Sequence, residues 1–155
     1  MKPGVHLTPL NPPFIAAYVA VAIWILQRFA PIYSFSFPGQ RFAATALIVA
    51  GFLLALQSLK RFLKADTTFD PTELDAATTL VTDGLFRYSR NPIYLGIATC
   101  LAGLGLSWGT LWTIPGVLAF CAILTRTQIL PEERALEKIF GEEYLEYKRR
   151  VRRWI

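Results

Sequence analysis

Charged side chains are missing from three long stretches of this sequence. No Asp, Glu, Lys or Arg occurs from Pro3 to Gln27, from Phe42 to Leu59, or from Asn91 to Thr125. A helix that crosses the hydrocarbon core of a bilayer needs about 20 mostly apolar residues, and these runs reach or exceed that scale. A soluble globule would place polar residues along every helix. The missing charges therefore predict an all-α integral membrane protein.

Residues that bind metals are also scarce. His6 is the single histidine, and the two cysteines, Cys100 and Cys121, lie inside apolar runs. Such cysteines have neither metal-ligand spacing nor the arrangement of a disulfide framework, and they usually behave as small hydrophobic residues. We therefore expect no metal site.

The apolar runs predict about four transmembrane helices in one domain, residues 1–155. The expected helices cover about 13–29, 41–64, 92–106 and 109–130. A secretory signal peptide is the alternative for the first, but a single lysine precedes it and no A-x-A-like cleavage site follows, so we expect a retained helix. The run from Asn91 to Thr125 would be roughly 50 Å long as one helix, against a hydrocarbon core of roughly 30 Å. It must fold back, and the segment Gly103–Thr110 has the glycines for a turn.

Lysine and arginine indicate the orientation of these helices. The loop 30–40 and the hairpin turn have none, whereas the ends of the long loop 65–89 and the C-terminal tail are rich in them. The positive-inside rule then places both termini and the long loop in the cytoplasm. The tail predicts two helices, 131–140 and 142–152, and its basic end suits an anionic membrane surface rather than a nucleic acid.

Two polar clusters meet the apolar runs at this charged end. The structural interpretation of "RYSRNPIYLG" is that Arg90 snorkels, Pro92 begins a helix and Tyr94 is an interfacial aromatic residue. Glu132 and Glu133 begin a tail helix, where carboxylates favour the N-terminus and pair with Arg90, Arg126 or Arg134. The functional interpretation is a polar site at the membrane surface, with a carboxylate that binds a cationic or hydroxyl-bearing ligand.

Both clusters, taken in order, resemble a known family. "LVTDGLFRYSRNPIYLG" (Leu80–Gly96) is followed, after an apolar hairpin, by "EERALEKIFGEEYLEYKRRV" (Glu132–Val151). This order and spacing resemble the isoprenylcysteine carboxyl methyltransferases, whose wider relatives are the membrane phospholipid methyltransferases. "TTFDP" before the first block looks like the short bacterial members. The resemblance covers about half of the chain, from Thr67 onward.

The resemblance implies an S-adenosylmethionine-dependent methyltransferase that acts on a lipophilic acceptor. It assigns the cofactor to Thr78, Thr79, Leu80, Val81, Phe86, Asn91, Pro92, Ile93, Tyr94 and Glu132. The side-chain chemistry adds Arg90, whose guanidinium suits the carboxylate of the cofactor. Arg126 or Gln128 falls near the position that holds the acceptor's carboxylate. One position departs from the family, because Asn91 stands where its relatives have histidine, and asparagine cannot carry a proton near neutral pH.

Methyl transfer from a sulfonium tolerates that change. The leaving group is already activated, so the protein mainly supplies proximity and orientation, and a carboxylate acceptor is ionised without a base. No general base is required, and Arg90 and Asn91 are the catalytic candidates. We expect a lipid-like or lipidated acceptor, contact with membrane lipid and a place in a bacterial inner membrane. The alternatives are an NADPH-dependent membrane reductase on a related scaffold and a non-enzymatic tetraspan scaffold.

Overall fold

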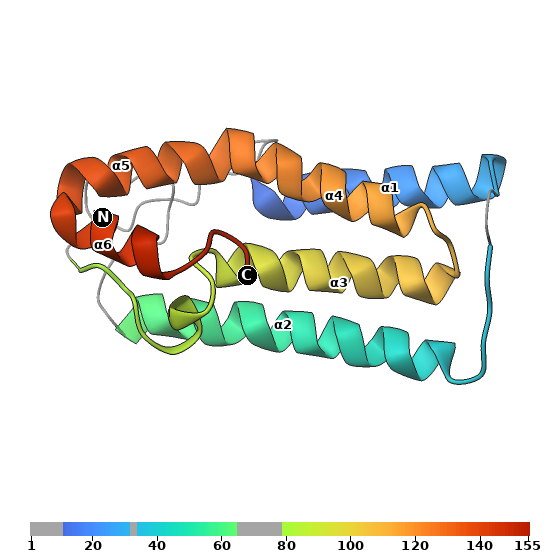
Figure 1. The fold of residues 1–155 in the computed structure, drawn as a ribbon. Helices are drawn as coiled ribbons and strands as arrows, with labels where there is room; N and C mark the ends of the chain where they lie inside the picture. Colours follow the sequence, from blue (N-terminus) through green and yellow to red (C-terminus); the bar gives the residue numbers. More distant parts are fainter. Residues whose placement is uncertain (1–10, 32–33, 65–78) are drawn as a thin grey trace, which may run out of the picture.

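The computed structural model describes residues 11–31, 34–64 and 79–155, with the side chains of 62–64 left aside. The elements are α1 (Pro12–Phe29), α2 (Gln40–Lys64), η2 (Gly84–Arg87), α3 (Pro92–Trp108), α4 (Thr113–Leu124), η3 (Thr125–Ile129), α5 (Leu130–Phe140) and α6 (Glu142–Arg150). The long helices lie lengthwise beside one another, and α6 folds back under α5 at one end (Figure 1). Within these residues the predicted all-α class is confirmed, and the strand-like pairing is one isolated bridge, Ser34 with Thr110.

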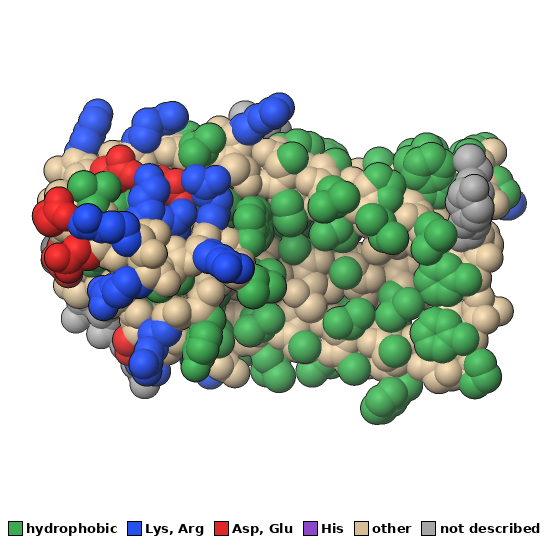
Figure 2. Space-filling view, in the orientation of Figure 1, with side chains coloured by type: hydrophobic (Ala, Val, Ile, Leu, Met, Phe, Trp, Pro, Cys, Tyr) green, Lys and Arg blue, Asp and Glu red, His purple; other side chains and the backbone are tan. Residues whose placement is uncertain are grey.

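Three helical stretches are long and apolar enough to cross a membrane. They are Pro12–Phe29, Gln40–Arg61 and Thr113–Phe140, and Pro92–Trp108 is apolar but shorter, at 17 residues. Hydrophobic side chains cover most of the molecule's length, and the charged ones gather at the end that carries α5 and α6 (Figure 2). This distribution is that of a membrane protein with one polar end. A fourth crossing, by α3, stays a prediction.

Helices α2 and α3 touch through their backbones. A Cβ atom built on Gly51 would lie 2.5 Å from the carbonyl oxygen of Gly96, and one built on Gly96 would lie 2.5 Å from that of Gly51. Glycines permit such contact because they carry no side chain, and in lipid close packing of this kind drives helix association. The Cys100 thiol joins the same contact by donating to the Ile48 carbonyl, 3.4 Å away.

The hairpin turn between α3 and α4 lies at Gly109–Trp112. Gly109 is left-handed, with φ +65°, and its N–H reaches the carbonyl oxygens at the end of α3, which is how glycine commonly ends a helix. Helix α4 therefore starts at Thr113, four residues after the predicted start at 109. The Trp112 indole N–H donates to the Ala30 carbonyl at 2.8 Å and ties this turn to the end of α1.

The predicted boundary at Pro131 is not a break. The sequence predicted a membrane helix that ends at 130 and a separate tail helix from 131, but α4, η3 and α5 run on as one helix (Figure 1). Proline inside a helix lacks an N–H and crowds the carbonyl four residues earlier. The preceding turn, η3, is a π-helix in which the Leu130 N–H bonds to the Thr125 carbonyl, and this wider turn accommodates the ring.

The main core lies where α1, α3 and α4 meet. Its buried residues are Ile15, Val19, Ile23, Ala98, Leu101, Phe120, Leu124 and Ile129. A second cluster, of Phe86, Tyr144 and Tyr147, packs η2 against α6 at the charged end. The two clusters fix the ends of the elements that form the candidate site.

Candidate functional site at the charged end of the bundle

The Arg-Asn-Pro turn forms the start of α3. Pro92 occupies the first turn of the helix, where its missing N–H costs nothing. Asn91 precedes it but does not cap the helix with its side chain. The Asn91 amide instead donates to the carbonyl of Arg153 at 3.0 Å, and the side chain is only 9% exposed. Asn91 thus connects the start of α3 to the C-terminal segment.

The C-terminal segment, residues 151–155, lies against this turn. The Arg90 N–H donates to the Arg152 carbonyl at 3.0 Å, and the Ser89 hydroxyl lies 3.4 Å from the Arg153 carbonyl. Trp154 packs against the main core. The predicted tail helix to 152 ends at Arg150 instead, because the chain after it is extended and binds the turn. The C-terminal segment is therefore bound to the residues that precede α3.

Glu133 is the centre of a buried ionic network. Its carboxylate accepts from Arg90 Nη2 at 2.8 Å, and from Nε and Nη2 of Arg153 at 2.9 and 2.8 Å. The Arg90 and Glu133 side chains are 7% and 5% exposed. The hydrogen bonds to Glu133 raise the pKa of Arg153, which keeps the guanidinium charged. Of the pairings that the sequence left open, the structure has Glu133 with Arg90.

Glu132 points to a different partner. The Tyr94 hydroxyl donates to Glu132 Oε1 at 2.5 Å, and both side chains are partly buried. In the part of the chain that the structure describes, no hydrogen bond reaches the second oxygen of Glu132. This carboxylate, oriented by one hydroxyl and with one oxygen available, suits a ligand that bears hydroxyl groups or an ammonium.

The loop residues before the turn pack around α6. Phe86 is buried with Tyr144 and Tyr147, and Leu80 and Val81 cover this cluster. The Tyr147 hydroxyl donates to the Phe86 carbonyl at 2.7 Å. Burial raises the pKa of Tyr147, so its hydroxyl stays protonated and remains a donor.

The other predicted site residues are spread more widely. Thr78 lies outside the described residues, and Thr79 is exposed. Pro92 is buried and Ile93 half-buried in the first turn of α3. Arg126 is exposed on η3, and Gln128 is half-buried and has an interaction of its own.

The structure thus brings Arg90, Asn91, Tyr94 and Glu132 to one end of the bundle. It does not join Arg126 to them by any hydrogen bond or ion pair among the described residues. Sequence reasoning named Arg90 as a partner of this glutamate pair but did not separate Glu133 from Glu132, and it missed Arg153. Two consecutive glutamates were the available signal, and they do not reveal which one faces which partner. Among the described residues, no three His, Cys, Asp or Glu side chains lie together as a metal site would require.

Fold and site together define an α-helical membrane protein with a polar, ion-paired end. The chain belongs to the phospholipid methyltransferase family, whose model matches residues 40–143. This match confirms the predicted relationship to the isoprenylcysteine and phospholipid methyltransferases. It covers α2 to the start of α6 and includes both polar clusters, whereas Arg153 lies beyond it.

Comparison with single proteins adds one relative. An uncharacterized protein of Haemophilus influenzae is 38% identical over 63 residues, which cover 41% of this chain and 100% of that protein. No solved structure matches the chain.

Proposed function

We propose that this protein transfers a methyl group from S-adenosylmethionine to a lipophilic acceptor in the membrane. Family membership supports methyl transfer in general. The Tyr94–Glu132 pair is the observation that supports a site at the polar end of the bundle, where it joins the start of α3 to α5. Such a location gives access both to lipid and to a water-soluble cofactor.

Glu132 is the residue proposed to contact the cofactor. Its second oxygen suits the ribose hydroxyls or the ammonium of S-adenosylmethionine, and Tyr94 orients the carboxylate. The aromatic ring of Tyr94 offers a face for a sulfonium, a contact worth about 1 kcal/mol. Phe86 is buried with Tyr144 and Tyr147, so we assign it to packing. When bound, the cofactor supplies an electrophilic methyl group on a leaving group that is already activated.

For Arg90 we propose a structural role in place of the cofactor contact that its charge suggested. Its guanidinium is buried against Glu133, so we assign it to positioning the turn rather than to the carboxylate of the cofactor. A charged pair of this kind holds the turn firmly, since separating it would leave a charge buried without its partner.

The acceptor is proposed to present a carboxylate of an isoprenyl-type or other lipid-like molecule. The residues that form the site offer carboxylates, an amide and a phenol but no imidazole. A carboxylate acceptor is already ionised near neutral pH and needs no base, whereas an amine or a thiol must first lose a proton. We further propose that the polar end faces the cytoplasm, with four helices crossing a bacterial inner membrane.

Calorimetric titration of the detergent-purified protein with S-adenosylmethionine and S-adenosylhomocysteine tests the proposal. We expect saturable binding that Glu132→Gln weakens and that Glu142→Gln, a change of equal charge on exposed α6, leaves unchanged. A radiolabelled methyl donor then compares a prenylcysteine carboxylate with phosphatidylethanolamine as acceptor. A folded sample that binds NADPH instead would support the reductase, and one that binds neither cofactor would support the scaffold.

A further inference from the structure

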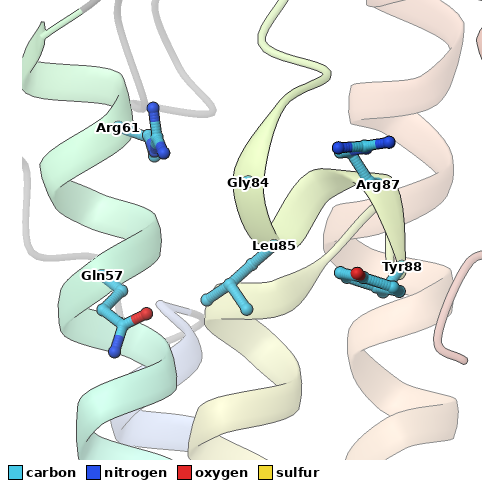
Figure 3. A pocket seen from close by; sticks show the side chains of 6 residues that line it. All are labelled: Gln57, Arg61, Gly84, Leu85, Arg87 and Tyr88. Carbon is cyan, nitrogen blue, oxygen red and sulfur yellow. The ribbon is translucent and has the colours of Figure 1, made fainter.

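A polar hollow lies between α2 and η2, and neither Tyr94 nor Glu132 lines it. It has a volume of about 290 Å³ and is lined by Gln57, Arg61, Gly84, Leu85, Arg87 and Tyr88. Gln57 and Arg61 come from α2, and the other four come from the turn that faces it (Figure 3). The Leu85 side chain points toward α2 and forms the apolar floor between the two elements (Figure 3).

The hollow lies where the apolar surface of α2 ends. From Phe42 to Leu56 that helix has no charged residue, and Gln57, Lys60 and Arg61 follow. Phe52 and Leu53, a little more than a turn before Gln57, are 62% and 46% exposed. In a membrane such side chains face acyl chains, so the hollow is at the level of the lipid headgroups.

Arg61 has an ion-pair partner on the turn that faces it. Its Nη1 donates to Asp83 at 2.7 Å. Gly84 is left-handed, with φ +60°, and a Cβ at that position would lie 3.0 Å from Arg61 Nε. The turn therefore leaves room for the arginine because residue 84 is a glycine.

Arg87 supplies the second positive charge of the hollow. It is exposed, and no ion pair or hydrogen bond joins its side chain to another described residue. Two guanidinium groups and one carboxylate leave the hollow positive, and the Gln57 amide and the Tyr88 hydroxyl add neutral donors. This set of donors suits a singly charged phosphodiester, which guanidinium groups bind through paired hydrogen bonds.

We propose that this hollow binds the phosphate of a membrane phospholipid, with the acyl chains lying along the exposed face of α2. A lipid phosphate meets two requirements together, since the hollow offers donors at its polar side and the adjoining helix offers an apolar surface. A free phosphate ion would use only the first. The inference rests on the membrane location of the chain and not on methyl transfer, so either can fail alone.

Native mass spectrometry of the protein released from detergent micelles tests the inference, with lipid adducts counted as a function of lipid concentration. We expect phosphatidylglycerol to bind and diacylglycerol, which has the same chains but no phosphate, not to bind at this site. Arg87→Gln should weaken the phosphatidylglycerol adduct about tenfold, as expected for one lost charge-assisted contact. Arg87→Lys keeps the charge but not the paired geometry, so its affinity for phosphatidylglycerol should lie between those of the wild type and Arg87→Gln.

The control is Arg134→Gln, which removes one positive charge from an exposed position on α5. It should bind phosphatidylglycerol as the wild type does. Equal losses in Arg134→Gln and Arg87→Gln would show attraction to net charge alone and overturn the site. Unchanged binding in both Arg61→Gln and Arg87→Gln would also overturn it. If inorganic phosphate competes for the site as strongly as the lipid does, the hollow binds a free anion and the lipid proposal is overturned.

Discussion

The hydroxyl of Tyr94 lies 2.5 Å from the carboxylate of Glu132, and this contact joins the first turn of α3 to the first turn of α5. The two residues are 38 positions apart in sequence. One residue further along α5, Glu133 turns to Arg90 and Arg153. Neighbouring carboxylates therefore have different partners, a phenol hydroxyl for Glu132 and two guanidinium groups for Glu133.

Removing the Tyr94 hydroxyl should reduce cofactor affinity by less than removing the Glu132 charge. Tyr94→Phe keeps the ring and leaves the carboxylate in place without its donor, whereas Glu132→Gln removes the group proposed to contact the cofactor. Because the two side chains share one hydrogen bond, the double variant should be non-additive by about 1 kcal/mol. Calorimetric titration of the four proteins with S-adenosylhomocysteine measures this coupling, and strict additivity would contradict the shared role.

Glu133→Gln should lower the free energy of unfolding far more than the same substitution does at an exposed position. The change leaves the Arg90 guanidinium buried without its counter-charge, at a cost of about 3 kcal/mol in the free energy of unfolding. Glu142→Gln is the matched control, because Glu142 and its partner Arg149 are both largely exposed and such pairs contribute about 0.5 kcal/mol. Tryptophan fluorescence during thermal unfolding in detergent compares the two, and equal melting temperatures would contradict the ionic network.

Asn91→Asp should be more harmful than Asn91→Ala. The amide of Asn91 donates to the Arg153 carbonyl, and alanine loses that bond for about 1 kcal/mol. Aspartate places a buried carboxylate oxygen against the Arg153 carbonyl oxygen. Two acceptors then face each other without a donor, which should lower the free energy of unfolding by roughly 1–3 kcal/mol. Digestion by a carboxypeptidase reports the result, since a loosened C-terminal segment should be trimmed fastest in Asn91→Asp. The opposite order would show that the amide does not hold this segment.

Gly96→Ala should separate α2 from α3. The added methyl group would lie 2.5 Å from the Gly51 carbonyl oxygen, so the helices must move apart, at a cost of roughly 1–3 kcal/mol. Ala46→Leu adds more volume at an exposed position of α2 and should change the melting temperature little. Unfolding of both variants at the wild-type temperature would contradict the close backbone contact between α2 and α3.

Much of this protein could be predicted without its structure because the signals are local. Uncharged runs of about 20 residues predict membrane helices wherever they occur, since the bilayer excludes unpaired charge. The motif around Asn91–Tyr94 and the glutamates at 132 and 133 led to the family in the same way, through short segments in a fixed order. These features depend on neighbouring residues and on spacing along the chain.

The tertiary structure decided how those segments meet. Consecutive residues of a helix point in directions about 100° apart, so only the position of the first turn of α5 beside residues 90–94 assigns Glu132 to Tyr94 and Glu133 to Arg90. The π-turn that carries the helix through Pro131 has no local signature that we recognised, because it depends on backbone hydrogen bonds that shift by one residue. The return of the chain end onto Asn91 joins residues 62 positions apart. Periodicity determines which faces are apolar, but contacts over such separations exist only once the helices have packed.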